Sequence, residues 1–384
     1  MLRRISLHHA LKAVAQAVDL VHPALRGHHM RTATLFMHIV AEAGTGPAAC
    51  RTGFIAAMLH DTGGLSESAR LAPLAATDTD VSTHARTGGA LLRRVPFLRE
   101  AAEVVTHHHT WWCNRTPAVP EITHALYLAD RVDVMLNTGE ETDYLAAADR
   151  VRRKVKTLAG GRFCPRYAEA FLRVSRPAAF WLSLEPQWHE AALEAASPVT
   201  GERISLREFC QLAGVLAFVV DTHSRSTYRH SREVATMAAR LGRAGGSDPM
   251  ACLKLETAGL LHDVGKLAIP AAVLDKAGPL TREERLLMQR HGWLTHRLLD
   301  GIPGAEDIAL WAGSHHENSA GTGYPYGVAA DELPEACRIV TVADIWSALT
   351  EARAYRPAMR PAEALEKMYG MLTSARDRAL LGRL

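Results

Sequence analysis

Histidine and aspartate residues recur in this chain in one order, once in each half. The second half has two single histidines, a His-Asp pair, a His-His pair and a final aspartate: His230, His262, Asp263, His291, His315, His316 and Asp344. The first half repeats the same types at His28, His60, Asp61, His84, His108, His109 and Asp130. Imidazoles and carboxylates bind divalent transition metals, and two such ions held together can cleave phosphate esters. The two sets therefore predict metal centres suited to that chemistry.

The spacing between equivalent residues indicates a duplicated domain. The offset is 202 residues for the first histidine and the His-Asp pair, 207 for the next histidine and the His-His pair, and 214 for the last aspartate. Offsets that stay constant inside a block and change between blocks are expected after a duplication with insertions in loops. Chance clustering of the chain's 20 histidines would not produce this series.

The segments that carry these residues have the pattern of helices. Apolar residues recur at helical spacing over 7–21, 28–44, 50–61 and 146–161, and several stretches end at glycine. No segment alternates with period two for long enough to predict a strand. We therefore expect an all-α protein built from two tandem helical bundles. The first should span 1–195 and the second 205–384, with the Pro- and Gly-containing segment 196–204 as the linker.

Composition narrows the class of protein. The chain has 384 residues, with 44 basic and 41 acidic side chains and a net charge of +3, which argues against polymeric nucleic acid as a partner. It has no apolar run long enough to span a bilayer and no secretory signal at its start. Six scattered cysteines favour a reducing compartment. We expect a cytoplasmic protein with no membrane contact; the oligomeric state, and whether the natural chain continues past residue 384, stay open.

The second half resembles the HD-GYP domain, a branch of the HD phosphohydrolase superfamily. The resemblance lies between residues 230 and 368 and includes LLHDVGKLAIP (260–270), HHENSAGTGYP (315–325) and TVADIWSAL (341–349). That family is all-helical and hydrolyses phosphodiester bonds of cyclic dinucleotides, chiefly cyclic di-GMP, with two or three iron or manganese ions. The resemblance implies the same fold and the same class of reaction for this half.

The resemblance also implies a ligand set. One ion would be held by His230, His262, Asp263 and Asp344, and the other by Asp263, His291, His315 and His316, so that Asp263 bridges the two. The ions would activate a water molecule for attack on phosphorus. Lys266 would neutralise charge on the phosphoryl oxygens, although a solvated lysine at a helix end is the alternative.

Other positions of the second half match residues that surround the site in the family. Arg353 and Arg356 match basic positions that bind the substrate phosphate, and exposed surface arginines are the alternative. Gly323, Tyr324 and Pro325 form the GYP loop, which borders the site and is implicated in contacts with signalling partner proteins.

Three residues depart from the family pattern. The aspartate that the family has in the GYP loop appears here as Ala320 or is displaced, and Ser347 stands where an aspartate follows the metal-binding Asp344 by three residues. Ser226 replaces the glutamate that members with three ions carry four residues before the first histidine. The third departure favours two ions. The first two leave the rate and the substrate preference open.

The first half resembles an HD domain of the same superfamily without the GYP loop. AMLHDTGG (57–64) matches LLHDVGK, with Gly64 at the position of Lys266, and HHHTWWCN (107–114) replaces the GYP segment. Because all ligand types are present, a metal ion could bind here too. The alternatives are a metal-bound regulatory domain, a second phosphohydrolase and a scaffold without metal.

The leading functional prediction is a metal-dependent phosphodiesterase. Its substrate would be cyclic di-GMP or cyclic GMP-AMP, and Asp263 and Lys266 would act in the reaction. Two alternatives remain: an HD phosphohydrolase that acts on another nucleotide or phosphate ester, and a non-catalytic sensor of cyclic dinucleotides. The identity of the metal and the extent of hydrolysis stay open.

Overall fold

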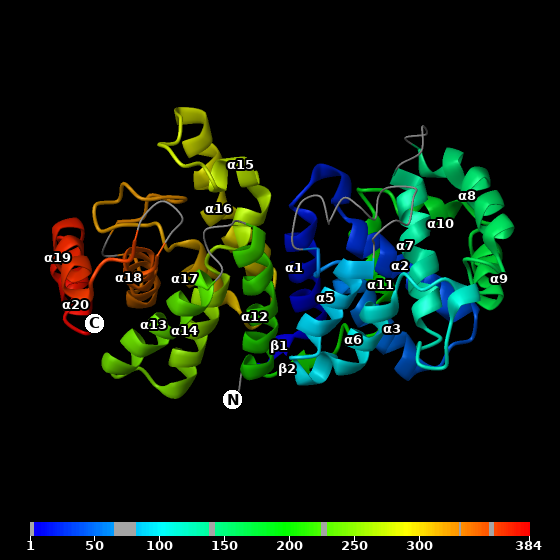
Figure 1. Ribbon diagram of the computed structural model, residues 1–384, viewed down its shortest axis with the longest axis horizontal. Helices are drawn as coiled ribbons and strands as arrows, with labels where there is room; N and C mark the ends of the chain where they lie inside the picture. The colour runs from blue at the N-terminus through cyan, green and yellow to red at the C-terminus, as the bar shows by residue number, and fades with distance from the viewer. Residues whose placement is uncertain (1–3, 65–81, 138–142, 224–228, 330–331, 353–356) are drawn as a thin grey trace. The chain divides into compact units, whose positions relative to one another are not determined.

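The computed structural model describes residues 4–64, 82–137, 143–223, 229–329, 332–352 and 357–384. The chain forms two compact units. We call Leu7–Glu202 the N-terminal unit, and Met1–Ser6 together with Arg203–Leu384 the C-terminal unit. Helices dominate both (Figure 1), and the described residues contain only two strands of two residues each. The all-α prediction is therefore confirmed.

The N-terminal unit consists of helices. They are α1 (Leu7–Asp19), η1 (Pro23–Leu25), α2 (His28–Glu42), α3 (Pro47–Leu59), α5 (Ser82–Leu92), η3 (Pro96–Leu98), α6 (Arg99–His107), η4 (Trp112–Asn114), α7 (Thr123–Asn137), α8 (Tyr144–Leu158), α9 (Pro165–Val174), α10 (Ala178–Leu182) and α11 (His189–Ala196).

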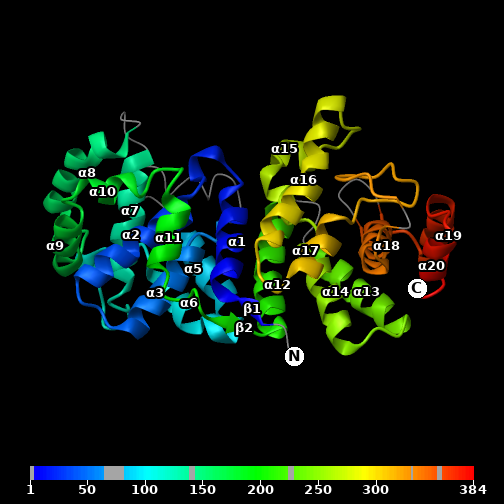
Figure 2. The same ribbon diagram turned by 180° about the vertical axis from the view of Figure 1, so that it is seen from behind.

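Helix α2 lies at the centre of this unit and contacts α3, α7, α9 and α11, as the two opposite views show (Figures 1 and 2). Its middle is apolar, and Leu35 and Phe36 are fully buried. Burying such a side chain contributes about 1.5–3 kcal/mol. Gly53 makes room for the ring, because a Cβ at that position would lie 2.1 Å from Cζ of Phe36.

The C-terminal unit holds the two strands and the remaining helices. They are β1 (Ile5–Ser6), β2 (Arg203–Ile204), α12 (Leu206–His223), α13 (His230–Ala244), α14 (Pro249–Leu261), η5 (Val264–Ala268), α15 (Ala271–Leu274), α16 (Arg282–Asp300), α17 (Glu306–Gly313), α18 (Glu335–Thr350), α19 (Pro361–Met371) and α20 (Ala375–Leu381).

The core of the C-terminal unit forms around α13 and α14, which pack on each other and on α18, while α12 covers α14. Gly259 allows the close approach of the first two helices, because a Cβ there would lie 2.6 Å from Cα of Ala235. No helix in the described part of the chain is long and apolar enough to cross a membrane.

The two strands lie where the chain passes between the units. β1 pairs antiparallel with β2, with Ile5 opposite Ile204. The segment 196–204, which we expected to be a linker, thus contains β2, and residues 4–6 lie with the C-terminal unit. The N-terminal unit begins and ends at one place, because the amide of Leu7 donates to the carbonyl oxygen of Glu202 at 3.0 Å.

Candidate metal centres

Five pairs of equivalent helices carry the sequence-predicted ligands. The first histidine begins α2 and α13, and the His-Asp pair follows α3 and α14. The next histidine lies within α5 and α16, and the His-His pair follows α6 and α17 closely. The final aspartate lies in α7 and α18. Each unit therefore brings its ligand types together from the same five positions of its fold.

In the C-terminal unit, the carboxylate of Asp263 faces two groups of histidines with its two oxygens. Its Oδ2 lies 3.2 Å from Nε2 of His262, and its Oδ1 lies 3.6 Å from Nε2 of His291 and 3.8 Å from Nε2 of His315. The ligand atoms fall into compact groups, His230 with His262 and Asp344, and His291 with His315 and His316, each within 4.8 Å. This is the arrangement of a carboxylate that can bridge two cations.

The N-terminal unit repeats this division. Oδ2 of Asp61 lies 3.7 Å from Nε2 of His28 and 3.6 Å from Nε2 of His60. Its Oδ1 lies 3.2 Å from Nε2 of His84 and 3.7 Å from Nε2 of His108. His109 joins the second group, in which four ligand atoms lie within 4.8 Å of one another. His29, the neighbour of His28, pairs instead with Asp19 at 2.6 Å.

Backbone carbonyl groups orient half of these ten imidazoles. In five of them Nδ1 donates to the carbonyl oxygen three residues earlier: His60 to Ala57, His108 to Val105, His262 to Gly259, His291 to Met288 and His315 to Ala312, at 2.6–2.8 Å. A bond at Nδ1 leaves the lone pair of Nε2 for the site. Nε2 of His291 and Nε2 of His315 are 3.3 Å apart, and two lone pairs at that distance repel unless a cation lies between them.

Buried polar atoms without partners point to the same conclusion. Among the described residues, Asp263 Oδ1 and His262 Nε2 have no hydrogen-bond partner, and neither has Asp61 Oδ1. Burying a charged or polar atom without a partner is costly, and a bound ion removes that cost. The donor set in both units therefore fits divalent metal ions.

The protonation states of Asp263, His291 and His315 suit metal binding. The pKa of His230 is instead raised to about 10, because burial opposes its protonation but its hydrogen bonds to Asp344 and Glu351 outweigh that penalty. Burial opposes ionisation of Asp263, but the charges of His262 and Lys266 outweigh it and hold the pKa of the carboxyl well below its usual range. Burial lowers the pKa of His291 to about 3 and that of His315 well below its ordinary value. At neutral pH the carboxylate is ionised and these imidazoles are neutral, as metal ligation requires.

A glycine after the His-Asp pair allows close packing at the site. A Cβ on Gly265 would lie 2.2 Å from the carbonyl oxygen of His291, and a Cβ on Gly63 would lie 2.0 Å from that of His84. No side chain fits there, so the equivalent glycine in each unit sets how closely the third histidine approaches the aspartate. In the C-terminal unit the next residue is Lys266, whose Nζ lies 2.5 Å from Oδ2 of Asp263.

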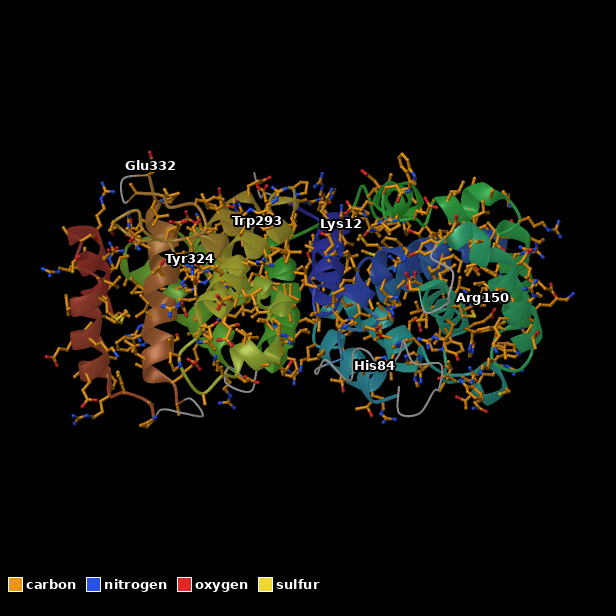
Figure 3. All side chains as sticks on the ribbon, turned by 90° about the horizontal axis from the view of Figure 1, so that it is seen from above. Lys12, His84, Arg150, Trp293, Tyr324 and Glu332 are labelled. Atoms are coloured by element: carbon orange, nitrogen blue, oxygen red, sulfur yellow. The ribbon has the colours of Figure 1, made fainter. Side chains whose placement is uncertain are left out.

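The GYP loop lies against the second group of histidines. The ring of Tyr324, labelled in Figure 3, lies with its centre 4.7 Å from that of His316. Gly323 passes so close to the backbone that a Cβ would lie 2.5 Å from the carbonyl oxygen of His316. Glu317 accepts hydrogen bonds from the backbone amides of residues 326–328, which hold the loop in place. Pro325 follows a cis peptide bond.

Sequence reasoning missed the carboxylates that orient the first histidine. Nδ1 of His28 donates to Asp133 at 2.7 Å, and Nδ1 of His230 donates to Glu351 at 3.1 Å. Asp133 occupies the position of Ser347, three residues after the metal aspartate, whereas Glu351 follows Asp344 by seven. Three and seven residues are one and two helical turns, so both carboxylates reach the same side. That spacing was the available signal.

Two arginines of the N-terminal unit were also missed. Nε of Arg31 donates to Asp133 at 2.6 Å, and the guanidinium of Arg131 contacts both oxygens of Asp130, the shortest contact being 2.9 Å. Both arginines are buried. The expected roles of Arg353 and Arg356, and the departure at Ser226, lie outside the described residues.

Comparisons with known proteins agree with this geometry. Family models described as the HD domain match residues 25–135 and residues 214–380. The chain belongs to the HD domain family. The two HD domains lie one in each unit, and the His-Asp pairs His60-Asp61 and His262-Asp263 lie within the matched residues.

Named relatives of this HD-domain chain come from bacteria. The 3'3'-cGAMP-specific phosphodiesterase 1 of Vibrio cholerae is 29% identical over 95% of this chain and 87% of its own length. The cyclic di-GMP phosphodiesterase response regulator RpfG of Xanthomonas campestris is 43% identical over 30% of this chain and 31% of its own. The crystal structure of the cyclic GMP-AMP phosphodiesterase V-cGAP3 of V. cholerae matches with a TM-score of 0.66 at 20% identity, covering 99% of this chain and 97% of that one. That likeness shows the shared fold.

Proposed function

We propose that this HD-domain protein is a metal-dependent phosphodiesterase that opens a cyclic dinucleotide in its C-terminal unit. The observation that carries the proposal is the division of the Asp263 carboxylate between two groups of histidines, with Lys266 beside it. The relatives named above support the class of substrate. The relative that aligns with nearly the whole chain is named for 3'3'-cGAMP, which makes that compound the first to test and cyclic di-GMP the second.

The residues that would hold two divalent ions follow from the geometry. Oδ2 of Asp263 with His230, His262 and Asp344 would hold one ion, and Oδ1 of Asp263 with His291, His315 and His316 the other. Mixed imidazole and carboxylate ligands suit iron or manganese. Bound ions of this kind lower the pKa of a water molecule and neutralise charge on a phosphate.

The remaining side chains would bind and orient the substrate. The ammonium of Lys266 lies beside the bridging carboxylate, where it can neutralise charge that develops on the phosphoryl oxygens. The ring of Tyr324 borders the second group of histidines and offers a surface on which a base can stack. We assign Arg353 and Arg356 to binding of the substrate phosphate, and Gly323 and Pro325 to the shape of the loop beside the site.

The rest of the proposal concerns the role of the N-terminal unit, the location of the protein and its partners. Gly64 stands in the N-terminal unit where the C-terminal unit has Lys266, which supports a regulatory rather than a hydrolytic N-terminal domain. The six cysteines are free, which supports a reducing, cytoplasmic location. The exposed ring of Tyr326 in the GYP loop offers a contact for a signalling partner. The nearly balanced charge argues against polymeric nucleic acid.

Hydrolysis by matched variants tests the proposal. The protein would be loaded anaerobically with manganese or iron and assayed with 3'3'-cGAMP and cyclic di-GMP. We expect turnover by the wild type and by His60→Ala/Asp61→Ala, and loss of turnover in His262→Ala/Asp263→Ala. Metal bound to the C-terminal unit without turnover of either compound would contradict the proposal. Loss of turnover in His60→Ala/Asp61→Ala alone would place the reaction in the N-terminal unit.

A further inference from the structure

The group around His28 in the N-terminal unit differs from its counterpart around His230. In the C-terminal unit Asp344 belongs to the compact group, and its Oδ1 lies 3.0 Å from Nε2 of His230. In the N-terminal unit the compact group contains His28, His60 and Asp61 without Asp130, whose Oδ1 lies 3.6 Å from Nε2 of His28. The aspartate equivalent to Asp344 is thus present in the N-terminal unit, but its carboxylate pairs with another group.

The partner of Asp130 is a neighbouring cation. The guanidinium of Arg131 contacts both carboxylate oxygens, with Nη2 at 3.1 Å from Oδ1 and 2.9 Å from Oδ2. Asp130 is fully buried and Arg131 is 7% exposed. A buried carboxylate paired in this way on both oxygens has its charge neutralised already, so an ion at this position would have to compete with the guanidinium. The ammonium of Lys266, by contrast, contacts one oxygen of Asp263 and is partly exposed, so it can give way to an ion.

A second arginine neutralises the carboxylate that orients His28. Nε and Nη2 of Arg31 donate to Oδ1 and Oδ2 of Asp133 at 2.6 and 3.2 Å. In the C-terminal unit the residues equivalent to the two arginines are Glu233 and Ile345, so no basic side chain stands at either position. Arg31 thus acts on the His28 side of the site through Asp133, and Arg131 acts on it through Asp130, whose Oδ1 lies 3.6 Å from Nε2 of His28.

The opposite side of the same site has the features of a metal-binding site. Nε2 of His84 lies 2.9 Å from Nε2 of His109, 3.3 Å from Nε2 of His108 and 3.2 Å from Oδ1 of Asp61. Among the described residues, Asp61 Oδ1 is one of the buried atoms without a hydrogen-bond partner. Three imidazoles and one carboxylate complete a four-coordinate transition-metal site.

We propose that the N-terminal unit binds a single divalent metal ion, in the tetrad of Asp61, His84, His108 and His109, and that Arg31 and Arg131 replace a second ion beside His28. The two units then share one ligand pattern and differ in the number of ions. The difference arises from the cations that surround each site.

Counting ions in the full-length chain tests this proposal. Stripped protein would be reloaded with Mn²⁺, desalted and analysed for metal per chain by mass spectrometry. We expect His108→Ala/His109→Ala to lose one ion relative to the wild type, and His28→Ala to lose none. Arg131→Ile, which copies the residue of the C-terminal unit, should gain one ion because it releases Asp130. Thermal melting of each variant would verify that it folds.

Several results would overturn the proposal. Loss of an ion from His28→Ala would place a metal ion beside His28, where the proposal has none. An unchanged metal count in His108→Ala/His109→Ala would show that the tetrad holds no ion. An unchanged count in Arg131→Ile would remove the role assigned to that arginine. If His28→Ala does not fold, Asp130→Asn tests the same side. Because every count is a difference within the N-terminal unit, these results do not depend on whether the C-terminal unit hydrolyses cyclic dinucleotides.

Discussion

The two units place the same ligand types on the same five pairs of helices, and their bridging aspartates divide between two groups of histidines in the same way. They differ in the basic side chains around that common centre. The C-terminal unit has Lys266 beside Asp263, whereas the N-terminal unit has Arg31 and Arg131 paired with Asp133 and Asp130. On these proposals, the ligand pattern defines where metal can bind, while the neighbouring charges would decide how many ions bind and what they can do.

The largest expected effect is on catalytic turnover and concerns the basic side chains in which the two units differ. Lys266→Met should lower kcat for a cyclic dinucleotide by about 100- to 1000-fold, the usual cost of removing one group that stabilises transition-state charge. The metal content should stay at the wild-type value, since lysine is not a ligand. Arg131→Met in the N-terminal unit is the contrast: it should add one ion, as Arg131→Ile does, and should not cause a comparable loss of kcat. Equal losses in both variants would break the proposed division of roles.

A smaller effect concerns the carboxylate that orients the first histidine. Glu351→Gln should weaken metal binding by the C-terminal unit by about 10- to 100-fold, because the hydrogen bond from His230 loses its charged acceptor. Competition with a chelator measures the affinity. The variant Ser347→Asp/Glu351→Gln copies the position that Asp133 occupies in the N-terminal unit and should restore part of the loss. If Glu351→Gln alone keeps the wild-type affinity for metal, Glu351 is not a positioning residue.

The smallest effect should be the same in both units. Gly265→Ala and Gly63→Ala each bring a Cβ against the backbone carbonyl of a candidate metal ligand, His291 or His84. We expect each to cost about 1–3 kcal/mol of stability, the range for overpacking a rigid site. Thermal melting with and without metal measures it. A large difference between the two variants would contradict the view that this glycine has the same role in both repeats.

Sequence reasoning predicted the helical fold because the spacing of apolar residues can be read within a single helix. It brought out the ligand pattern because offsets between equivalent residues stay constant within each short block. It missed Glu351 and Arg31 because their roles depend on which face of one helix meets another. It missed Arg131 because the sequence does not show that this side chain folds back onto the carboxylate of its neighbour Asp130. The pairing of Asp19 with His29, and of Asp221 with Ser231, also repeats at an offset of 202, but the partner residue changes type and hides the relation. The two-residue strand β1 was missed since it is too short to show any period.

The pairing of β1 with β2 makes the C-terminal unit discontinuous along the chain. During synthesis its first strand emerges before the whole N-terminal unit and must wait for Arg203 and Ile204 before it can pair. The N-terminal unit is thus an insertion attached at both ends, and one cut near residue 203 would leave it covalently joined to β1. A deletion that removes β1 would therefore disturb the C-terminal unit, although the N-terminal unit is the one that follows β1 directly in sequence.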